Sequence, residues 1–170
     1  ATFLKHGISA QGSMFNEMYP VVHHSTQHLE DADLAAMATY LLGEQPPAAK
    51  VIKEVPLDHL SDSATRGHQQ YLNVCAGCHG VEGEGKPHIA VAMQGNTVLR
   101  QGDSRNLVKA ILEGIREQQF TGFERMQPMP GFANKLTDEQ VTDMVNYLRQ
   151  AWGGLPGDLS VQQLAELKAE

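Results

Sequence analysis

The segment Cys75-Ala76-Gly77-Cys78-His79 places two thiols and an imidazole within one short stretch of chain. On a helix, residues three and four positions apart lie on one face, so these side chains can meet the same flat object. This spacing is typical of covalent haem attachment, in which each thiol adds to a vinyl group and the histidine ligates the iron. We therefore predict one haem c per chain, bonded to Cys75 and Cys78, with His79 as an axial iron ligand.

Three other uses of the cysteine pair are less consistent with the sequence. A zinc site would need four ligands, and the chain has no second cysteine pair. A thioredoxin-like redox pair is expected beside a βαβ pattern, which the neighbouring sequence lacks. A plain disulfide between Cys75 and Cys78 is the remaining alternative.

The second axial ligand decides whether the iron transfers electrons or binds exogenous ligands. Met129 is our choice, because it lies between two prolines that restrict the backbone around it. A thioether favours Fe(II) and raises the reduction potential relative to a second histidine. The alternative is that Met129 only fills space in the core. The other candidate ligands are Met126, Met93 and His88.

Amphipathic segments predict the helices that position this site, and no useful strand pattern accompanies them. The expected helices cover residues 31–42, 63–78, 104–113 and 138–152. The expected helix 104–113 has Asp103 as its N-terminal cap and Gly114 as its terminator. The expected helix 138–152 opens with the capping-box pattern Thr137-Asp138-Glu139-Gln140. The fold class is therefore all-α.

Composition restricts the partners. Thirteen Lys and Arg residues against twenty Asp and Glu residues give a net charge of −7, which disfavours nucleic acid and anionic lipid. The longest apolar run, Leu34 to Leu42, is too short for a membrane span, and no targeting segment opens the chain. Aromatic residues make up only 6% of the chain, which leaves room for an apolar cofactor in the core.

Residues 44–60, with paired prolines, read as a linker. The segments on either side match at one fixed offset, which places Asp31 on Asp138 and Gly7-Ile8 on Gly114-Ile115. Chance similarity between two amphipathic helices is the alternative. At the same offset the counterpart of Cys75 would lie before residue 1. Residues 1–43 are therefore predicted to be the back half of a domain without its haem motif.

Several short motifs between residues 61 and 153 recur together in one known family. They are Cys75-Ala76-Gly77-Cys78-His79-Gly80, Gly83-Glu84-Gly85, Met129-Pro130-Gly131-Phe132, Asn146-Tyr147-Leu148-Arg149 and Trp152-Gly153. Through these motifs residues 61–153 resemble a class I cytochrome c, and in detail the last haem domain of multihaem cytochrome subunits of membrane-bound bacterial alcohol, gluconate and fructose dehydrogenases. The resemblance implies that Gly67, Tyr71 and Cys75 on the first helix cross the last helix at Met144 and Tyr147.

The N-terminal piece is similar to the methionine-side half of a preceding haem domain in such subunits, and this similarity implies that Met18 is that domain's iron ligand. The expected organisation is a partial cytochrome c-like segment at 1–43, a linker at 44–60, a cytochrome c domain at 61–153 and a tail at 154–170. We expect residues 1–43 to dock on the haem domain or to form a homo-oligomer. Deletion of residues 1–50 should leave the haem spectrum unchanged.

The resulting functional hypothesis is one-electron transfer from a dehydrogenase towards quinone or another acceptor, without catalysis by this chain. The location would be periplasmic, with membrane association through partner subunits. A peroxidase or gas sensor with a displaceable methionine is the alternative, although no distal acid–base pair is recognisable. Arg100 and Arg105 are candidates to reach the haem propionates.

Overall fold

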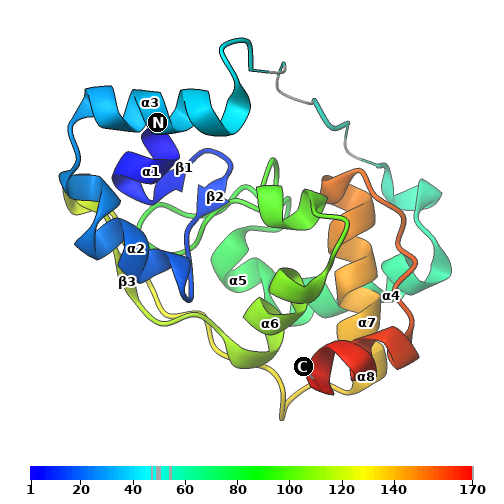
Figure 1. The fold of residues 1–170 in the computed structure, drawn as a ribbon. Helices are drawn as coiled ribbons and strands as arrows, with labels where there is room; N and C mark the ends of the chain where they lie inside the picture. Colours follow the sequence, from blue (N-terminus) through cyan, green and yellow to red (C-terminus); the bar gives the residue numbers. More distant parts are fainter. Residues whose placement is uncertain (47, 49–50, 54, 170) are drawn as a thin grey trace.

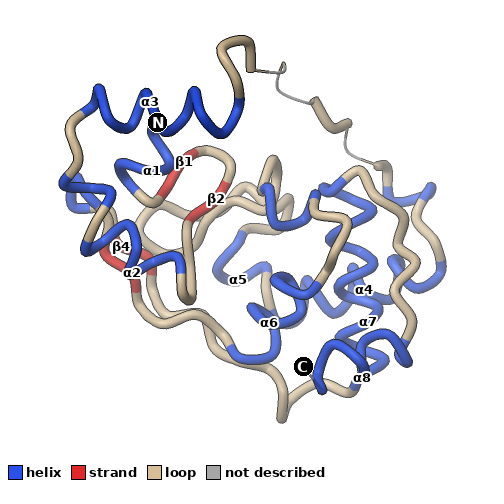
Figure 2. Tube along the Cα trace, viewed as in Figure 1, coloured by secondary structure: helices blue, strands red, loops and turns tan. Residues whose placement is uncertain are grey.

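The computed structural model describes residues 1–46, 48, 51–53 and 55–169, and helices dominate it (Figure 1). The strands form two short antiparallel pairs, β1 (Ile8–Ser9) with β2 (Gly12–Ser13) and β3 (Gln118–Gln119) with β4 (Arg125–Met126), as Figure 2 shows. The predicted all-α class with an N-terminal helical extension is confirmed. The α-helices are α1 (Thr2–His6), α2 (Met18–His24), α3 (Asp31–Leu42), α4 (Asp62–Val74), α5 (Ala76–His79), α6 (Arg105–Glu113), α7 (Asp138–Leu148) and α8 (Val161–Ala169).

Helices α4 and α7 cross at the centre of the core, as the resemblance implied. A Cβ atom on Gly67 would lie 1.9 Å from the Asp143 carbonyl oxygen, so only glycine permits this approach. Beside the crossing, the rings of Tyr71, Tyr147 and Trp152 contact one another with centroids 5.1, 5.2 and 5.6 Å apart. This aromatic cluster packs α4 against α7 directly before the cysteine motif, which begins where α4 ends.

Local signals account for most helix ends. Thr137 accepts from the Gln140 backbone, and the Gln140 side chain accepts from the Thr137 backbone, which confirms the capping box of α7. Asp103 lies two residues before α6 begins, and its Oδ1 accepts from the Arg105 backbone N–H at 2.8 Å. The N-cap position itself is Ser104 and not the predicted Asp103. Gly114 ends α6 with φ of 77°.

Two predicted helices differ from the observed ones. The segment 63–78 is divided at Cys75, where φ of −113° separates α4 from α5. Cys75 O then accepts from the N–H groups of both Cys78 and His79, which makes the haem motif a separate tight turn. The last helix leaves α geometry after Leu148 and continues as a π-turn over Arg149–Gly153.

The N-terminal segment, residues 1–43, packs beside the loop that leads to Met129 (blue elements in Figure 1). The Tyr19 hydroxyl donates to Gln119 O and accepts from Gln119 N, both at 3.0 Å. The Thr97 N–H donates to Gln11 O at 3.0 Å. These contacts confirm that the segment docks on the haem domain.

Helix α3 contributes one buried side chain, Leu34, to this arrangement. Its last turn faces solvent, with Tyr40 90% and Leu41 66% exposed. The predicted linker follows, and positions 47, 49–50 and 54 of it lie outside the described residues. Residues 57–59 of the linker form a 3-10 turn, and the Val55 N–H donates to Ala151 O.

The tail after residue 153 folds back on the core. Just before α8 begins, Asn146 Oδ1 accepts from the Leu159 N–H at 2.9 Å, and Asn146 Nδ2 donates to the Leu159 carbonyl oxygen at 3.0 Å. Leu164 on α8 is fully buried beside α6 and α7. Within the described part of the chain, no helix has the length and apolarity needed to span a bilayer.

Candidate functional site

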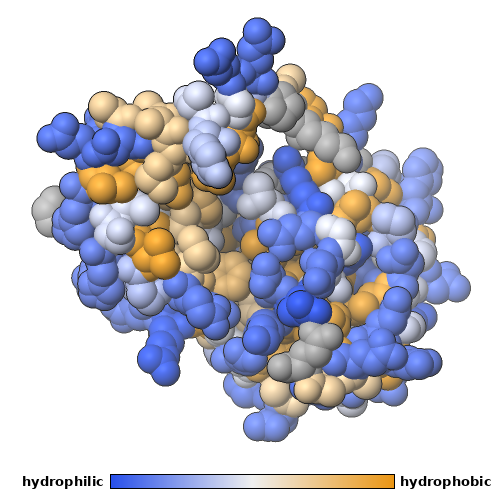
Figure 3. All heavy atoms as spheres, in the orientation of Figure 1, coloured by the Kyte–Doolittle hydropathy of each residue, from blue (hydrophilic) through white to orange (hydrophobic). Residues whose placement is uncertain are grey.

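Two adjoining cavities with mainly apolar linings lie between the cysteine motif and the Met129 loop. Figure 3 shows that the surface is hollowed between the N-terminal segment and the rest of the molecule, with apolar side chains inside the hollow. A continuous apolar space of this kind fits a large flat ring. Both cavities share six lining residues, which are Ser13, Cys75, His79, Val91, Ile115 and Met129.

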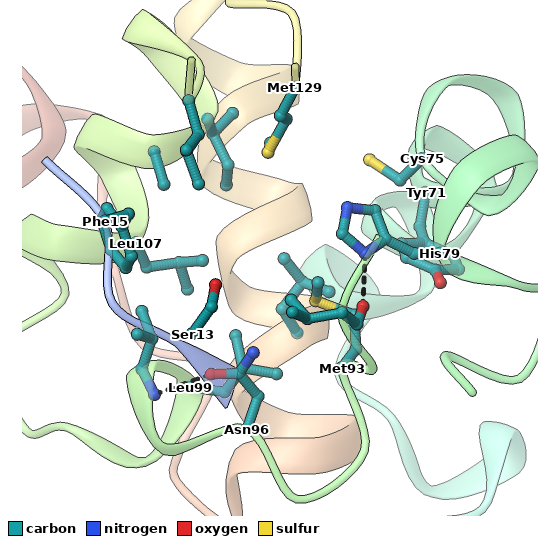
Figure 4. Close-up of a pocket in the computed structure, with 16 residues that line it drawn as sticks. Ser13, Phe15, Tyr71, Cys75, His79, Met93, Asn96, Leu99, Leu107 and Met129 are labelled. Atoms are coloured by element: carbon teal, nitrogen blue, oxygen red, sulfur yellow. Dashed lines mark hydrogen bonds between the residues drawn. The ribbon is translucent and has the colours of Figure 1, made fainter. Parts of the chain in front are cut away.

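His79 is buried at one side of this space. Burial lowers its pKa, which keeps the imidazole neutral, and its Nδ1 lies 2.8 Å from the Val91 carbonyl oxygen. When a neutral imidazole donates its proton from Nδ1, Nε2 is unprotonated and its lone pair can ligate a metal. Nε2 points into the cavity in Figure 4, which is the orientation that an iron ligand requires.

Met129 enters the same space from the opposite side, with its sulfur directed inward (Figure 4). Its backbone pairs with Ile115 in both directions, with N···O distances of 2.8 and 3.0 Å. A Cβ atom on Gly114 would lie 2.4 Å from Met129 O, so glycine is needed for this pairing as well as for the end of α6. The residues around Met129 therefore fix its position through the backbone.

The two cysteines lie at the rim of the space as free thiols. Cys75 lines both cavities, and burial raises the pKa of its thiol to about 12. Its Sγ is 3.5 Å from Met144 Sδ, so α7 packs directly on the attachment position. Cys78 is exposed and lines the second cavity. Both thiols can therefore reach one edge of a ring in the cavity.

The other candidate ligands are less well placed. Met126 borders only the second cavity and Met93 only the first. His88 is outside both linings, and its Nδ1 lies 3.4 Å from Glu124 Oε1. Met18, 49% exposed, is also outside both linings. Neither Arg100 nor Arg105 lines either cavity.

The N-terminal segment supplies cavity residues that the sequence did not reveal. Ser13 and Phe15 line the first cavity (Figure 4). Met14, between them in the sequence, is buried. We expected deletion of residues 1–50 to leave the haem spectrum unchanged, and the structure differs because residues 11–15 place Ser13 and Phe15 in a wall of the haem cavity. No sequence motif marks this role, since it depends on docking between distant segments. The spectrum of a protein without residues 1–43 is therefore expected to change.

A helical fold that encloses an apolar cavity behind a CAGCH turn defines a protein with covalently bound haem c. Comparison with known families agrees, since the model of the cytochrome c family matches residues 64–152. The chain belongs to this family, and its haem c serves electron transfer.

Curated relatives match nearly the whole chain. The cytochrome c subunit of a quinone-dependent alcohol dehydrogenase from Gluconobacter oxydans is 32% identical over 98% of the chain and 36% of its own length. The cytochrome c subunit of gluconate 2-dehydrogenase from Pantoea cypripedii is 29% identical over 99% of the chain and 40% of its own length. The cytochrome subunit of fructose dehydrogenase from Gluconobacter japonicus is 26% identical over 98% and 39%. The chain thus spans less than half the length of these relatives.

Proposed function

We propose that Cys75 and Cys78 carry the thioether bonds to haem and that His79 and Met129 are the axial ligands of its iron. The observation that carries this assignment is the opposed placement of two ligand atoms. His79 Nε2 and the Met129 sulfur enter the cavity from opposite sides, while the Val91 carbonyl and the Ile115 backbone hold these two residues. A flat ring between them has both axial positions filled.

The bound haem supplies a one-electron Fe(III)/Fe(II) couple. The residues of the chain hold it, exclude water and set its potential. Met129 would hold the iron on the side opposite His79, and these two residues together would leave no open site for substrate. The apolar lining disfavours the extra positive charge of the oxidised centre, and this raises the reduction potential.

Two measurements test the assignment. The mass of the denatured protein, made in a host that attaches haem c, should include one haem, and Cys78→Ala should retain it through a single thioether. The visible spectrum of the reduced protein should be unchanged by carbon monoxide at neutral pH. Rapid carbon monoxide binding would instead favour the peroxidase or gas-sensor alternative.

We infer the partners from the names of the relatives, which are cytochrome subunits of dehydrogenases. In this proposal the chain accepts electrons from a dehydrogenase subunit in the periplasm and passes them to quinone or another acceptor. Membrane association occurs through partner subunits. Reduction of the purified cytochrome by its dehydrogenase with substrate present, followed by reoxidation with a soluble quinone, tests this direction of flow.

Residues 1–43 are proposed to be the back half of a preceding haem domain. Two structural correspondences support the internal repeat. Gly7 and Gly114 both follow a helix with a positive φ, of 72° and 77°, although ψ differs, at −5° and −176°. Helix α3 begins at Asp31 as α7 begins at Asp138. In this arrangement Met18, at the start of α2, is available as the ligand of another iron.

The surface of this segment offers a contact for the missing half. The exposed apolar side chains of its helices are Met18, Val21, Tyr40, Leu41 and Leu42. We propose that the haem-bearing front half of the preceding domain covers them, and a homo-oligomer is the alternative. In a longer chain that includes the upstream sequence, Met18→Ala should change the spectrum of one haem and leave the Met129-ligated haem unchanged. A dimer of the present chain that dissociates on Leu41→Asp would favour the alternative.

A further inference from the structure

The two opposite edges of a haem ring carry different groups, so the two sides of its cavity must differ. The two vinyl groups lie on one edge of the ring and the two propionate carboxylates on the opposite edge. Attachment through Cys75 and Cys78 therefore directs the carboxylates to the far side of the cavity. An ionised carboxylate away from water needs hydrogen-bond donors.

The far wall carries two polar side chains, Ser13 and Asn96, across the cavity from Cys75 (Figure 4). Asn96 already makes two hydrogen bonds within its own loop, since Oδ1 accepts from the Val98 N–H and Nδ2 donates to Ala92 O, both at 3.1 Å. The half-buried Ser13 hydroxyl has no hydrogen-bond partner among the described residues, and Figure 4 shows its oxygen directed into the cavity.

The backbone on both sides of Ser13 is fixed. Gly12, with φ of 121°, lies against the Asn96 amide, where a Cβ atom would be 3.0 Å from Oδ1. The next residue, Met14, accepts a hydrogen bond from Gln118 Nε2 at 2.6 Å through its carbonyl oxygen. Ser13 also pairs with Ile8 in the β1–β2 ladder. The hydroxyl is thus held at the cavity wall by contacts with three separate segments, which limits the entropy lost when it donates.

We propose that Ser13, from the N-terminal segment, is a positioning residue that donates a hydrogen bond to a haem propionate. This inference rests on the proposed attachment of haem through Cys75 and Cys78. It gives residues 11–15 a direct part in setting the properties of a cofactor that is attached more than sixty residues later in the sequence.

The hydrogen bond makes the reduction potential depend on Ser13. A donor stabilises the ionised carboxylate and lowers its pKa. As pH rises through that pKa, the new negative charge stabilises Fe(III), so the reduction potential falls. Removal of the hydroxyl raises the propionate pKa, by about one unit for a hydrogen bond of ordinary strength. The pH range in which the reduction potential falls therefore moves upward by the same amount.

The experiment compares the haem-loaded protein with Ser13→Ala, Ser13→Thr and Ser25→Ala. Ser25 is exposed in the same N-terminal segment and its side chain caps no helix, so it is a matched control. The midpoint potential is measured as a function of pH, and the resonance Raman propionate bending band reports hydrogen bonding directly. We expect Ser13→Ala to shift both, and Ser13→Thr and Ser25→Ala to retain the parent values.

Unchanged values in Ser13→Ala, or equal shifts in the alanine and threonine variants, would overturn the proposal. If Ser13→Ala folds poorly, Ser13→Gly removes the same hydroxyl with less steric demand and is judged by the same two readouts. A parent protein without covalent haem, or without the methionine–iron charge-transfer band, would instead refute the proposed function. The two failures are therefore distinguishable.

Discussion

Gln118 Nε2 donates to the Met14 carbonyl oxygen at 2.6 Å, and the contact is buried on both sides. Gln118 begins the β3 strand on the loop that leads to Met129, whereas Met14 follows directly after Ser13 in the N-terminal segment. One hydrogen bond therefore joins the wall formed by residues 11–15 to the loop that carries the proposed axial ligand.

Gln118→Ala should loosen this wall. The Met14 carbonyl oxygen would lose its partner inside the protein, at a cost of about 1–3 kcal/mol in the free energy of unfolding. Hydrogen–deuterium exchange of residues 11–15 should accelerate, and chemical denaturation of the haem-loaded protein measures the loss. Gln119→Ala is the control, because that side chain is exposed. Equal effects from both variants would show that the Met14 contact is not the cause.

Gly67→Ala should destabilise the crossing of α4 and α7. The added Cβ would meet the Asp143 carbonyl oxygen at 1.9 Å, so the helices must separate. Overpacking of this kind costs about 1–3 kcal/mol or more, measured as a lower denaturation midpoint. Gly77→Ala, inside the haem motif, is the control, since a Cβ there has no neighbour within 4 Å. A Gly67→Ala protein as stable as its parent would contradict this account of the crossing.

Met129→Ala should lower the reduction potential by on the order of 0.1 V, a fraction of the range that axial ligands span, and open the iron to carbon monoxide. Met126→Ala should do neither, because Met126 borders only the second cavity. Spectroelectrochemistry and carbon monoxide titration measure both effects. Persistence of the methionine–iron charge-transfer band in Met129→Ala would show that another sulfur is the ligand.

Asn146→Ala should release the C-terminal tail. The change leaves the Leu159 N–H and carbonyl without their side-chain partner and removes a donor to Ser63 Oγ. We expect proteolysis between residues 154 and 160 to accelerate, with a loss of about 1–3 kcal/mol in the free energy of unfolding. Gln162→Ala on exposed α8 surface is the control. An unchanged cleavage pattern in Asn146→Ala would contradict this role.

Local sequence signals predicted the start of α7 and the end of α6 correctly. The capping box at Thr137 and the glycine after α6 act over a few residues, so their meaning does not depend on distant contacts. Gly67 was identified only through the resemblance, yet its physical reason is simple, since a neighbouring backbone lies where a side chain would be.

The break at Cys75 and the role of Ser13 could not be predicted from local patterns. Helical spacing across residues 63–78 continues through Cys75, whereas the observed bend lets one carbonyl accept two N–H groups of the following turn. Ser13 has an ordinary sequence context. Its place in the cavity depends on contacts with residues 96 and 118, and such long-range docking leaves no periodic signal.

The wall formed by residues 11–15 has a consequence for biosynthesis. These residues leave the ribosome before the CAGCH segment, yet in the folded protein they close the space into which the ring must enter. The proposed thioether bond to Cys75, which is buried in the final structure, requires that its thiol is still accessible when haem is attached. In this proposal a segment made before the haem motif is therefore among the last to reach its final position, and a premature hydrogen bond between Gln118 and Met14 would obstruct maturation of the cytochrome.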